Sequence, residues 1–282
     1  MKIIRHLTAE GPAYASLLPD GRALALAGDP KKGDLRVTGT EVVPGRLLAP
    51  VEPSTIYGIG LNYPQYASEL GRPPLAWPLL FIKSASCVQD PGQPIELPVT
   101  LASGAVDYEG ELAVVIGRTA KNVSRECALD YVLGYTIAND ISARDWQFEL
   151  GGGQFCQGKS FDTFCPFGPV LVTADELPDP SALTLRTYVN GTLRQSASTR
   201  DMFFDVPSLI AFLSASKTLL PGTLILTGTP GGVGHSFDPP VYLKPGDTVS
   251  VEIEKIGTLT NSVIEEAGPA DLTQTALRFR HQ

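Results

Sequence analysis

Two acidic residues, Glu109 and Glu111, stand immediately before the apolar run 112–116. On an extended strand, residues two apart point to the same face, so we expect the two carboxylates to lie side by side. Such a pair is tolerated at neutral pH when water solvates it, when one carboxyl keeps its proton, or when a cation lies between the two. No paired Cys or His stands nearby, so a hard divalent cation with oxygen ligands is the natural candidate. The alternative is a solvent-exposed edge strand.

A third carboxylate closes another predicted strand. The apolar segment 134–139 leads into Asp140, which follows Glu111 by 29 residues. If the strands that carry these two residues are neighbours in a sheet, Asp140 supplies a third oxygen ligand for the same cation.

The segment 153–160 matches the phosphate-loop pattern G-x-x-x-x-G-K-S. A working phosphate loop needs a buried strand before it and a helix after it, so that backbone N–H groups surround the phosphates. Here glycines precede the motif, and Pro166 stops the chain before two helical turns can form. We therefore do not expect nucleotide binding. Lys159 is interpreted as a lone cation aimed at an anionic substrate, and the alternative is an ordinary surface lysine.

The composition narrows the class of protein. The chain has 282 residues, 43% of them apolar, and a formal net charge of −8. This charge argues against a nucleic-acid partner, whose phosphates it would repel. An apolar run of about 18 residues and a signal-peptide pattern are both absent from the sequence, and the four cysteines show neither metal-type spacing nor a disulfide framework. We expect a cytoplasmic protein that does not enter a membrane.

Short apolar runs separated by turn residues predict a strand-dominated, mixed α/β fold. Residues 1–50 indicate a small β-rich N-terminal domain, and a proline-containing linker leads into a second domain over 51–282. Pro64 and Gly71 frame a helix of about two turns, and a second helix is expected over 208–217, with its cap at Ser208. Asn190-Gly191 marks a hairpin turn. Strands are expected at 55–60, 79–83, 134–140, 183–193, 223–226 and 248–254.

Five motifs in fixed order resemble the fumarylacetoacetate hydrolase superfamily, from about residue 55 to about residue 265. These motifs are YGIGLNY at 57–63, DYEGEL at 107–112, NDISARDWQ at 139–147, GKSFDTFCPFGP at 158–169 and LTGTPGGVG at 226–234. The resemblance implies a β-roll with a small N-terminal domain, assembled as a homodimer. It also implies a metal site for Mg²⁺ or Mn²⁺, with Glu109, Glu111 and Asp140 as ligands.

The resemblance further implies a substrate site. Arg144, Gln147, Lys159 and Thr229 match positions that in relatives hold or polarise the carboxylate and keto oxygens of the substrate. A divalent cation that chelates a 2-oxo acid stabilises the enolate that forms when a C–C bond breaks, and Lys159 adds positive charge where negative charge develops. We therefore expect a small anionic 2-oxo or 1,3-diketo acid as substrate.

The predicted lid helix departs from the family pattern. Relatives that hydrolyse carry His and Glu spaced H-x-x-E on this helix, whereas here Tyr66 takes the His position and Glu69 remains. A tyrosine with a pKa of about 10 is a poor base at pH 7 but a usable proton donor. Glu69 can act alone if lid closure raises its pKa, and His235 is the alternative base. Catalytic roles are therefore expected for Glu69, Lys159 and Tyr66.

Three functional hypotheses follow. The family pattern predicts C–C bond cleavage of the acylpyruvate type, in which a water molecule must be activated. Tyr66 strengthens a second hypothesis, a decarboxylase, tautomerase or isomerase reaction on a keto acid, because none of these reactions needs that water. The third is a metal- and ligand-binding relative without catalysis, against which the retention of three carboxylates, Lys159 and Arg144 argues.

Overall fold

The computed structural model describes residues 1–268 and confirms the strand-dominated fold. Residues 269–282, the last part of the expected second domain, lie outside the described residues. Among residues 1–268, no helix is long and apolar enough to cross a membrane.

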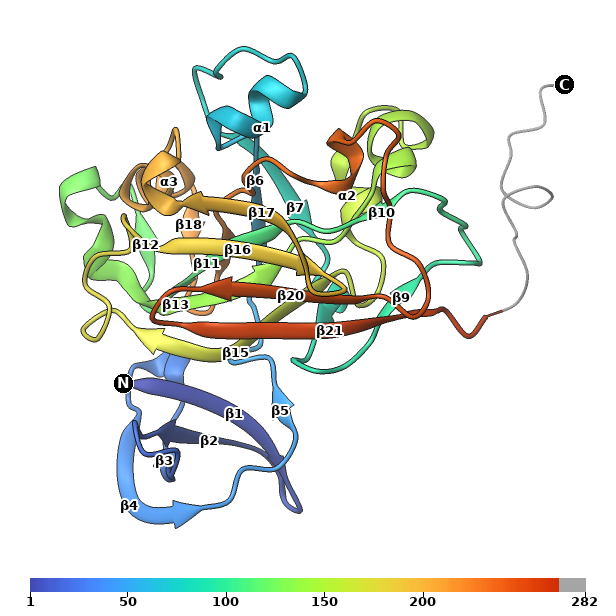
Figure 1. Ribbon diagram of the computed structural model, residues 1–282. Coiled ribbons are helices and arrows are strands. Elements are labelled where there is room, and N and C mark those ends of the chain that lie inside the picture. The colour runs from blue at the N-terminus through green and yellow to red at the C-terminus, as the bar shows by residue number, and fades with distance from the viewer. Residues whose placement is uncertain (269–282) are drawn as a thin grey trace, which may run out of the picture.

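A large sheet runs through the whole molecule and joins its two parts. Its strands, in spatial order, are β4 (Arg36–Val42), β3 (Ala23–Ala27), β2 (Gly11–Leu17), β1 (Lys2–Thr8), β15 (Cys165–Thr173), β13 (Val132–Asn139), β11 (Gly110–Ile116), β19 (Leu224–Leu226), β6 (Ile56–Gly60) and β7 (Leu79–Lys83). Two short strands extend it: β5 (Leu47–Leu48) pairs with β1, and β8 (Val88–Gln89) with β15. Strands β1–β4 form a lobe beneath β15, on the side away from helix α1 (Figure 1). The antiparallel β1–β15 pair connects this lobe to the rest of the molecule.

A second sheet covers the central strands of the first. It consists of β17 (Thr192–Ser198), β16 (Thr184–Val189), β20 (Thr248–Ile253), β21 (Gly257–Glu265) and β9 (Ile95–Leu97). Leu112 and Val114 of β11 share one apolar core with Leu185 of β16 and Val251 of β20. Strand β11 is consequently buried along its whole length. Two small ladders complete the strands: β10 (Val106–Asp107) with β14 (Ser142–Ala143), and β12 (Ala120–Lys121) with β18 (Thr218–Leu219).

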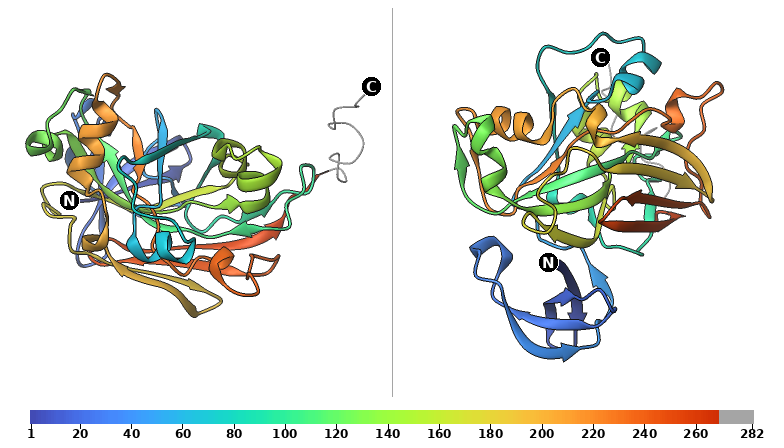
Figure 2. Two further views of the ribbon diagram at one scale, coloured as in Figure 1. Left: turned by 90° about the horizontal axis from the view of Figure 1, so that it is seen from above. Right: turned by 60° about the vertical axis from the view of Figure 1, so that its left-hand side comes forward.

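The helices are short and lie at the edges of the sheets (Figure 2). They are α1 (Pro64–Glu69), α2 (Phe155–Lys159) and α3 (Val206–Ser214), together with a π-helical turn (Trp146–Leu150) and single 3₁₀ segments, the longest being Arg125–Tyr131. Pro64 opens α1 and Gly71 takes a left-handed φ of 61° just beyond its end, as predicted. The predicted cap of the later helix was wrong. The Asp205 carboxylate accepts a hydrogen bond from the Ser208 N–H at 3.0 Å, so α3 begins at Val206.

The predicted hairpin turn is confirmed. Asn190 and Gly191 both have positive φ angles, 51° and 74°, and connect β16 to β17. This conformation matches the right-handed twist of the two strands. The turn aligns β17 so that Gln195 reaches the start of β11.

Candidate active site

The three acidic residues form one buried cluster. Glu109 and Glu111 flank Gly110 at the start of β11, and Asp140 follows the last residue of β13. The antiparallel register places Gly110 opposite Asn139, which brings the two strand ends together. One oxygen from each of the three carboxylates lies within 4.8 Å of the others. Their exposed fractions are 4%, 1% and 0%, so the alternative of a solvent-exposed edge strand is wrong.

Gly110 lets the second sheet approach this cluster closely. A Cβ atom at this position would overlap the Thr187 hydroxyl of β16. The Gly110 N–H instead donates to Gln195 Oε1 of β17 at 3.0 Å. The glycine between the two glutamates therefore serves packing, while the glutamates face the site.

Two buried lysines neutralise part of the cluster. Lys159, at the end of α2, places Nζ 2.6 Å from Glu109 Oε2 and 2.8 Å from Asp140 Oδ2. Lys83, at the end of β7, places Nζ 2.6 Å from Asp140 Oδ1. Although burial alone would raise the pKa of Asp140, the two ammonium groups hold it below its ordinary value. Asp140 is therefore ionised at neutral pH.

Glu111 has no cationic side chain in contact among residues 1–268. Its Oε2 accepts a hydrogen bond from the Gly228 N–H at 2.7 Å. Burial, followed by the charges of Asp140 and Glu109, raises its pKa well above the ordinary value. The nearby Tyr63 hydroxyl is buried without a hydrogen-bond partner in the described part of the chain. Three carboxylates with oxygen donors only, one of them lacking a counter-charge, fit a hard divalent cation such as Mg²⁺ or Mn²⁺.

Arg144 forms ion pairs with carboxylates of the protein itself. Its guanidinium is buried and pairs with Asp107 Oδ2 at 2.8 Å and with Glu109 Oε1 at 2.7 Å. It also donates to Gln147 Oε1 at 3.0 Å. In this structure Arg144 orients Glu109 and Gln147, and it is not among the residues that line the cavity described below.

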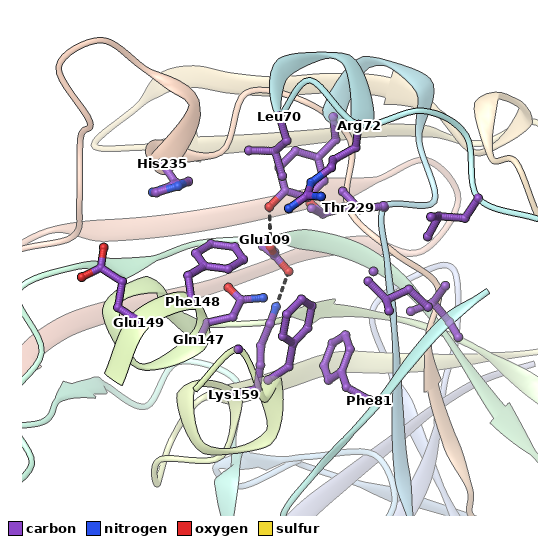
Figure 3. Close-up of a pocket in the computed structure, with 18 residues that line it drawn as sticks. Leu70, Arg72, Phe81, Glu109, Gln147, Phe148, Glu149, Lys159, Thr229 and His235 are labelled. Atoms are coloured by element: carbon purple, nitrogen blue, oxygen red, sulfur yellow. Dashed lines mark hydrogen bonds and ion pairs between the residues drawn. The ribbon is translucent and has the colours of Figure 1, made fainter. Parts of the chain in front are cut away.

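A cavity of about 630 Å³ opens above the cluster. Its wall includes Tyr66, Glu109, Gln147, Lys159 and Thr229, five of the residues singled out from the sequence. Figure 3 shows Glu109, Gln147, Lys159 and Thr229 around a common space with aromatic side chains such as Phe81 and Phe148. The Thr229 hydroxyl donates to the Gly110 carbonyl at 3.0 Å and accepts from Gln195 Nε2 at 2.7 Å, which fixes its orientation. Polar groups at the floor and apolar side walls suit a small organic anion.

The two residues of the lid pattern point in different directions. The Tyr66 hydroxyl donates to Glu109 Oε1 at 3.5 Å, and burial raises its pKa above the ordinary value, so it stays a phenol. Glu69 is exposed and is not among the cavity-lining residues. Both of its oxygens accept a hydrogen bond from the Gly232 N–H at 3.1 Å. Here Glu69 ties the lid helix to the loop 228–234, and a role as base stays a prediction.

His235, the alternative base, does line the cavity. Its Nδ1 lies 2.8 Å from the Tyr242 hydroxyl, and its ring lies 5.4 Å from that of Phe148. The backbone N–H donates to Asp107 Oδ2 at 3.0 Å, which ties this loop to the Arg144 network. Partial burial, and then the charge of Arg144, lower the pKa of His235 below 6.5. At neutral pH the imidazole is therefore uncharged and able to accept a proton.

Sequence reasoning missed three residues that hold the site together. Lys83 pairs with Asp140, Asp107 pairs with Arg144, and Gln195 hydrogen-bonds both Gly110 and Thr229. A weak signal existed for Lys83, because it is a charge that closes an otherwise apolar strand. Asp107 lies within the motif DYEGEL but was given no role of its own.

Comparison with known proteins agrees with the fold and with the motif order. The family model described as fumarylacetoacetate (FAA) hydrolase C-terminal matches residues 55–264. Mitochondrial oxaloacetate tautomerase fahd2 of Xenopus laevis is 48% identical over 219 residues, which are 77% of this chain and 68% of that protein. The solved structure of 2-hydroxyhepta-2,4-diene-1,7-dioate isomerase from Mycobacterium marinum is 42% identical with a TM-score of 0.82, covering 95% of this chain and 100% of that one. Fumarylacetoacetate hydrolase from Exiguobacterium antarcticum is 38% identical with a TM-score of 0.85, covering 94% and 100%. The chain therefore belongs to the fumarylacetoacetate hydrolase family and is an enzyme of that superfamily.

Proposed function

We propose that this enzyme is a metal-dependent tautomerase that interconverts the enol and keto forms of a 2-oxo acid of the oxaloacetate type. The observation that carries the proposal is the lid. Tyr66 stands over Glu109 where hydrolysing relatives have His, and the Glu69 carboxylate is bound to the Gly232 N–H outside the cavity. A lid that carries no His, and whose Glu69 is hydrogen-bonded to Gly232, favours a reaction that needs no activated water. Relatives named oxaloacetate tautomerase and 2-hydroxyhepta-2,4-diene-1,7-dioate isomerase support the same class of reaction.

The floor of the cavity suits the enolate that this reaction passes through. A divalent cation held by Glu109, Glu111 and Asp140 would supply Lewis-acid stabilisation of the negative oxygen. Lys159 adds a fixed positive charge at the same place, because its Nζ lies between Glu109 and Asp140. Gln147, whose Oε1 accepts from Arg144, keeps its amide NH2 group to donate to the carboxylate and keto oxygens of the substrate, while the Thr229 hydroxyl, which donates to the Gly110 carbonyl, forms part of the wall beside them.

His235 is the group that we assign to proton transfer at C3. In the keto form, the neutral imidazole accepts a proton from C3, and the electron pair of that C–H bond forms the C2=C3 double bond. The electrons of the C2=O bond move to oxygen, which takes up a proton from solvent water and becomes the enol hydroxyl, while the imidazolium gives the proton from C3 up to solvent, so that no net proton is gained or lost. The reverse sequence returns the keto form. This role assigns the ring hydrogen to Nδ1, which donates it to the Tyr242 hydroxyl oxygen 2.8 Å away, so that Nε2 has the lone pair that accepts the proton.

The proposal is tested by following the ultraviolet absorbance of enol oxaloacetate after mixing with enzyme, with Mg²⁺ and with EDTA. We expect the wild-type enzyme to accelerate loss of the enol, and EDTA or Glu111→Gln to remove the acceleration. The matched control Glu265→Gln changes an exposed carboxylate of β21 and should leave the rate unchanged.

Hydrolysis and decarboxylation are the outcomes that would overturn the proposal. The same enzyme is therefore given an acylpyruvate, with pyruvate release as readout, and its carbon dioxide release from oxaloacetate is measured. If either product forms faster than the enol is lost, the enzyme is a hydrolase or a decarboxylase, with His235 as the remaining base in the cavity.

A further inference from the structure

Arg72 brings a second positive charge to the cavity wall, in addition to that of Lys159. It follows the lid helix α1 and the left-handed Gly71, and its side chain lines the cavity. Figure 3 shows it extending from the lid end of the cavity toward the space above Glu109. Its backbone N–H donates to the Ala67 carbonyl at 2.8 Å, so the position of Arg72 is tied to the lid helix.

Arg72 differs from the other cations of the site in having no counter-charge. Lys83, Lys159 and Arg144 each pair with a buried carboxylate at 2.8 Å or less. The Arg72 side chain makes no ion pair and no hydrogen bond within the described part of the chain. Arg72 is an exposed residue of the cavity wall, so its planar guanidinium offers a two-pronged site for a carboxylate at the open edge of the cavity.

A further charged residue of the cavity wall indicates which end of the cavity a second substrate carboxylate would face. Glu149 lies beyond Phe148, on the side of His235, whereas Arg72 lies at the lid end (Figure 3). Leu75, Leu79 and Phe81 supply apolar wall in the same cavity. An extended substrate therefore meets the acidic cluster and Lys159 with its 2-oxo acid end, and meets positive rather than negative charge at the lid end.

We propose that Arg72 binds the second carboxylate of a dicarboxylic 2-oxo acid and thereby selects dicarboxylates over monocarboxylates. The inference rests on the proposed function for the 2-oxo acid end only. The Arg72 N–H donates to the Ala67 carbonyl of the lid helix. An ion pair between the Arg72 guanidinium and the second carboxylate of the substrate would therefore also hold the lid helix over the substrate.

Binding is measured by titration calorimetry in Mg²⁺ with two ligands of equal carbon number, 2-oxoglutarate and 2-oxopentanoate. The wild-type enzyme should bind 2-oxoglutarate about 10-fold or more tightly than 2-oxopentanoate, since one charge-assisted pair separates the two ligands. Arg72→Gln should weaken 2-oxoglutarate by that factor and leave 2-oxopentanoate unchanged, and Arg72→Lys should restore part of the difference. The control Arg36→Gln removes the same charge from exposed β4 and should change neither ligand.

Turnover separates this inference from the proposed function. The KM for enol oxaloacetate should rise about 10-fold in Arg72→Gln with little change in kcat, while the enol of the monocarboxylate acetylpyruvate is unaffected. Arg72-dependent binding of 2-oxoglutarate without any tautomerase activity would sustain the inference and overturn the proposed function. Tautomerase activity with equal affinity for both ligands, or an unchanged preference in Arg72→Gln, would overturn the inference alone. A wild-type enzyme that binds neither ligand would also overturn it.

Discussion

Lys83 is the residue whose removal tests the charge arrangement of the site most directly. Its ammonium group is completely buried, 2.6 Å from Asp140 Oδ1 and 3.2 Å from the Ile141 carbonyl. The substitution Lys83→Met keeps most of the volume and removes the charge. Asp140 then keeps Lys159 as its remaining cationic partner among the described residues, next to two other carboxylates. We expect the folded protein to be destabilised when no divalent cation is present.

The size of this effect follows from the burial of the pair. Removing one partner of a buried ion pair costs about 3–5 kcal/mol, because the other charge is left without compensation. Unfolding entropy of about 2.1 cal/mol/K per residue gives about 0.6 kcal/mol/K for a chain of this length. The expected fall in Tm is therefore about 5–8 °C in EDTA.

The assay is thermal unfolding followed by circular dichroism, with EDTA and with increasing Mg²⁺. The control Lys121→Met removes an exposed lysine of β12 and should change the free energy of unfolding by less than about 0.5 kcal/mol. Because Lys83→Met makes the cluster more negative, Mg²⁺ should raise the Tm of this variant more than that of the wild type. A variant that is as stable as the wild type in EDTA, or that gains less from Mg²⁺, would refute the view that Lys83 balances the charge of Asp140.

Two further predictions concern the acid–base groups above the cluster. Because the pKa of His235 lies below 6.5, kcat/KM for the tautomerase should stay level as the pH falls from 8 to 6.5 and should drop only when the imidazole takes up a proton. His235→Gln should lower the rate by about 10²-fold or more and abolish this fall in kcat/KM at acidic pH. If the fall persists in the variant, another group causes it. Tyr66→His restores the H-x-x-E spacing with Glu69, so cleavage of an acylpyruvate should rise by about 10²-fold over the wild type. The control is Tyr66→Phe, which introduces no base. Equal hydrolysis by both variants would show that the absence of a His at position 66 does not limit water activation.

The local residue patterns and the order of the motifs predicted most of the fold, but they did not predict which charged residues pair over long sequence distances. The spacing of Glu109 and Glu111 on a strand and the position of Asp140 after its neighbour sufficed to bring three carboxylates together. Pro64, Gly71 and the turn Asn190-Gly191 carry their own backbone preferences, so their elements were recovered. No local preference says which carboxylate a buried lysine will meet.

The direction of Glu69 shows the same limit on a smaller scale. Tyr66 and Glu69 are three residues apart in helix α1, and this spacing places them on the same side of the helix. The glycines of the loop 228–234 decide the outcome. A Cβ at Gly231 would overlap Glu69, so the absence of a side chain there lets Glu69 reach the Gly232 N–H. That contact links two segments about 160 residues apart in the sequence, a separation at which residue spacing carries no information.

The charge balance of the buried network indicates an order of binding. Four carboxylates, those of Asp107, Glu109, Glu111 and Asp140, lie among three cations, Lys83, Arg144 and Lys159, within the described residues. With Glu111 ionised the network carries one net negative charge, and the neighbouring carboxylates Asp140 and Glu109 add to burial, the larger cause, in raising the pKa of Glu111. In that state the site repels a substrate carboxylate. A divalent cation would reverse the sign to one net positive charge, which a single carboxylate then neutralises. The cation should therefore bind before the keto acid, and the affinity for 2-oxopentanoate, which lacks the second carboxylate, should depend on Mg²⁺ as strongly as that for 2-oxoglutarate.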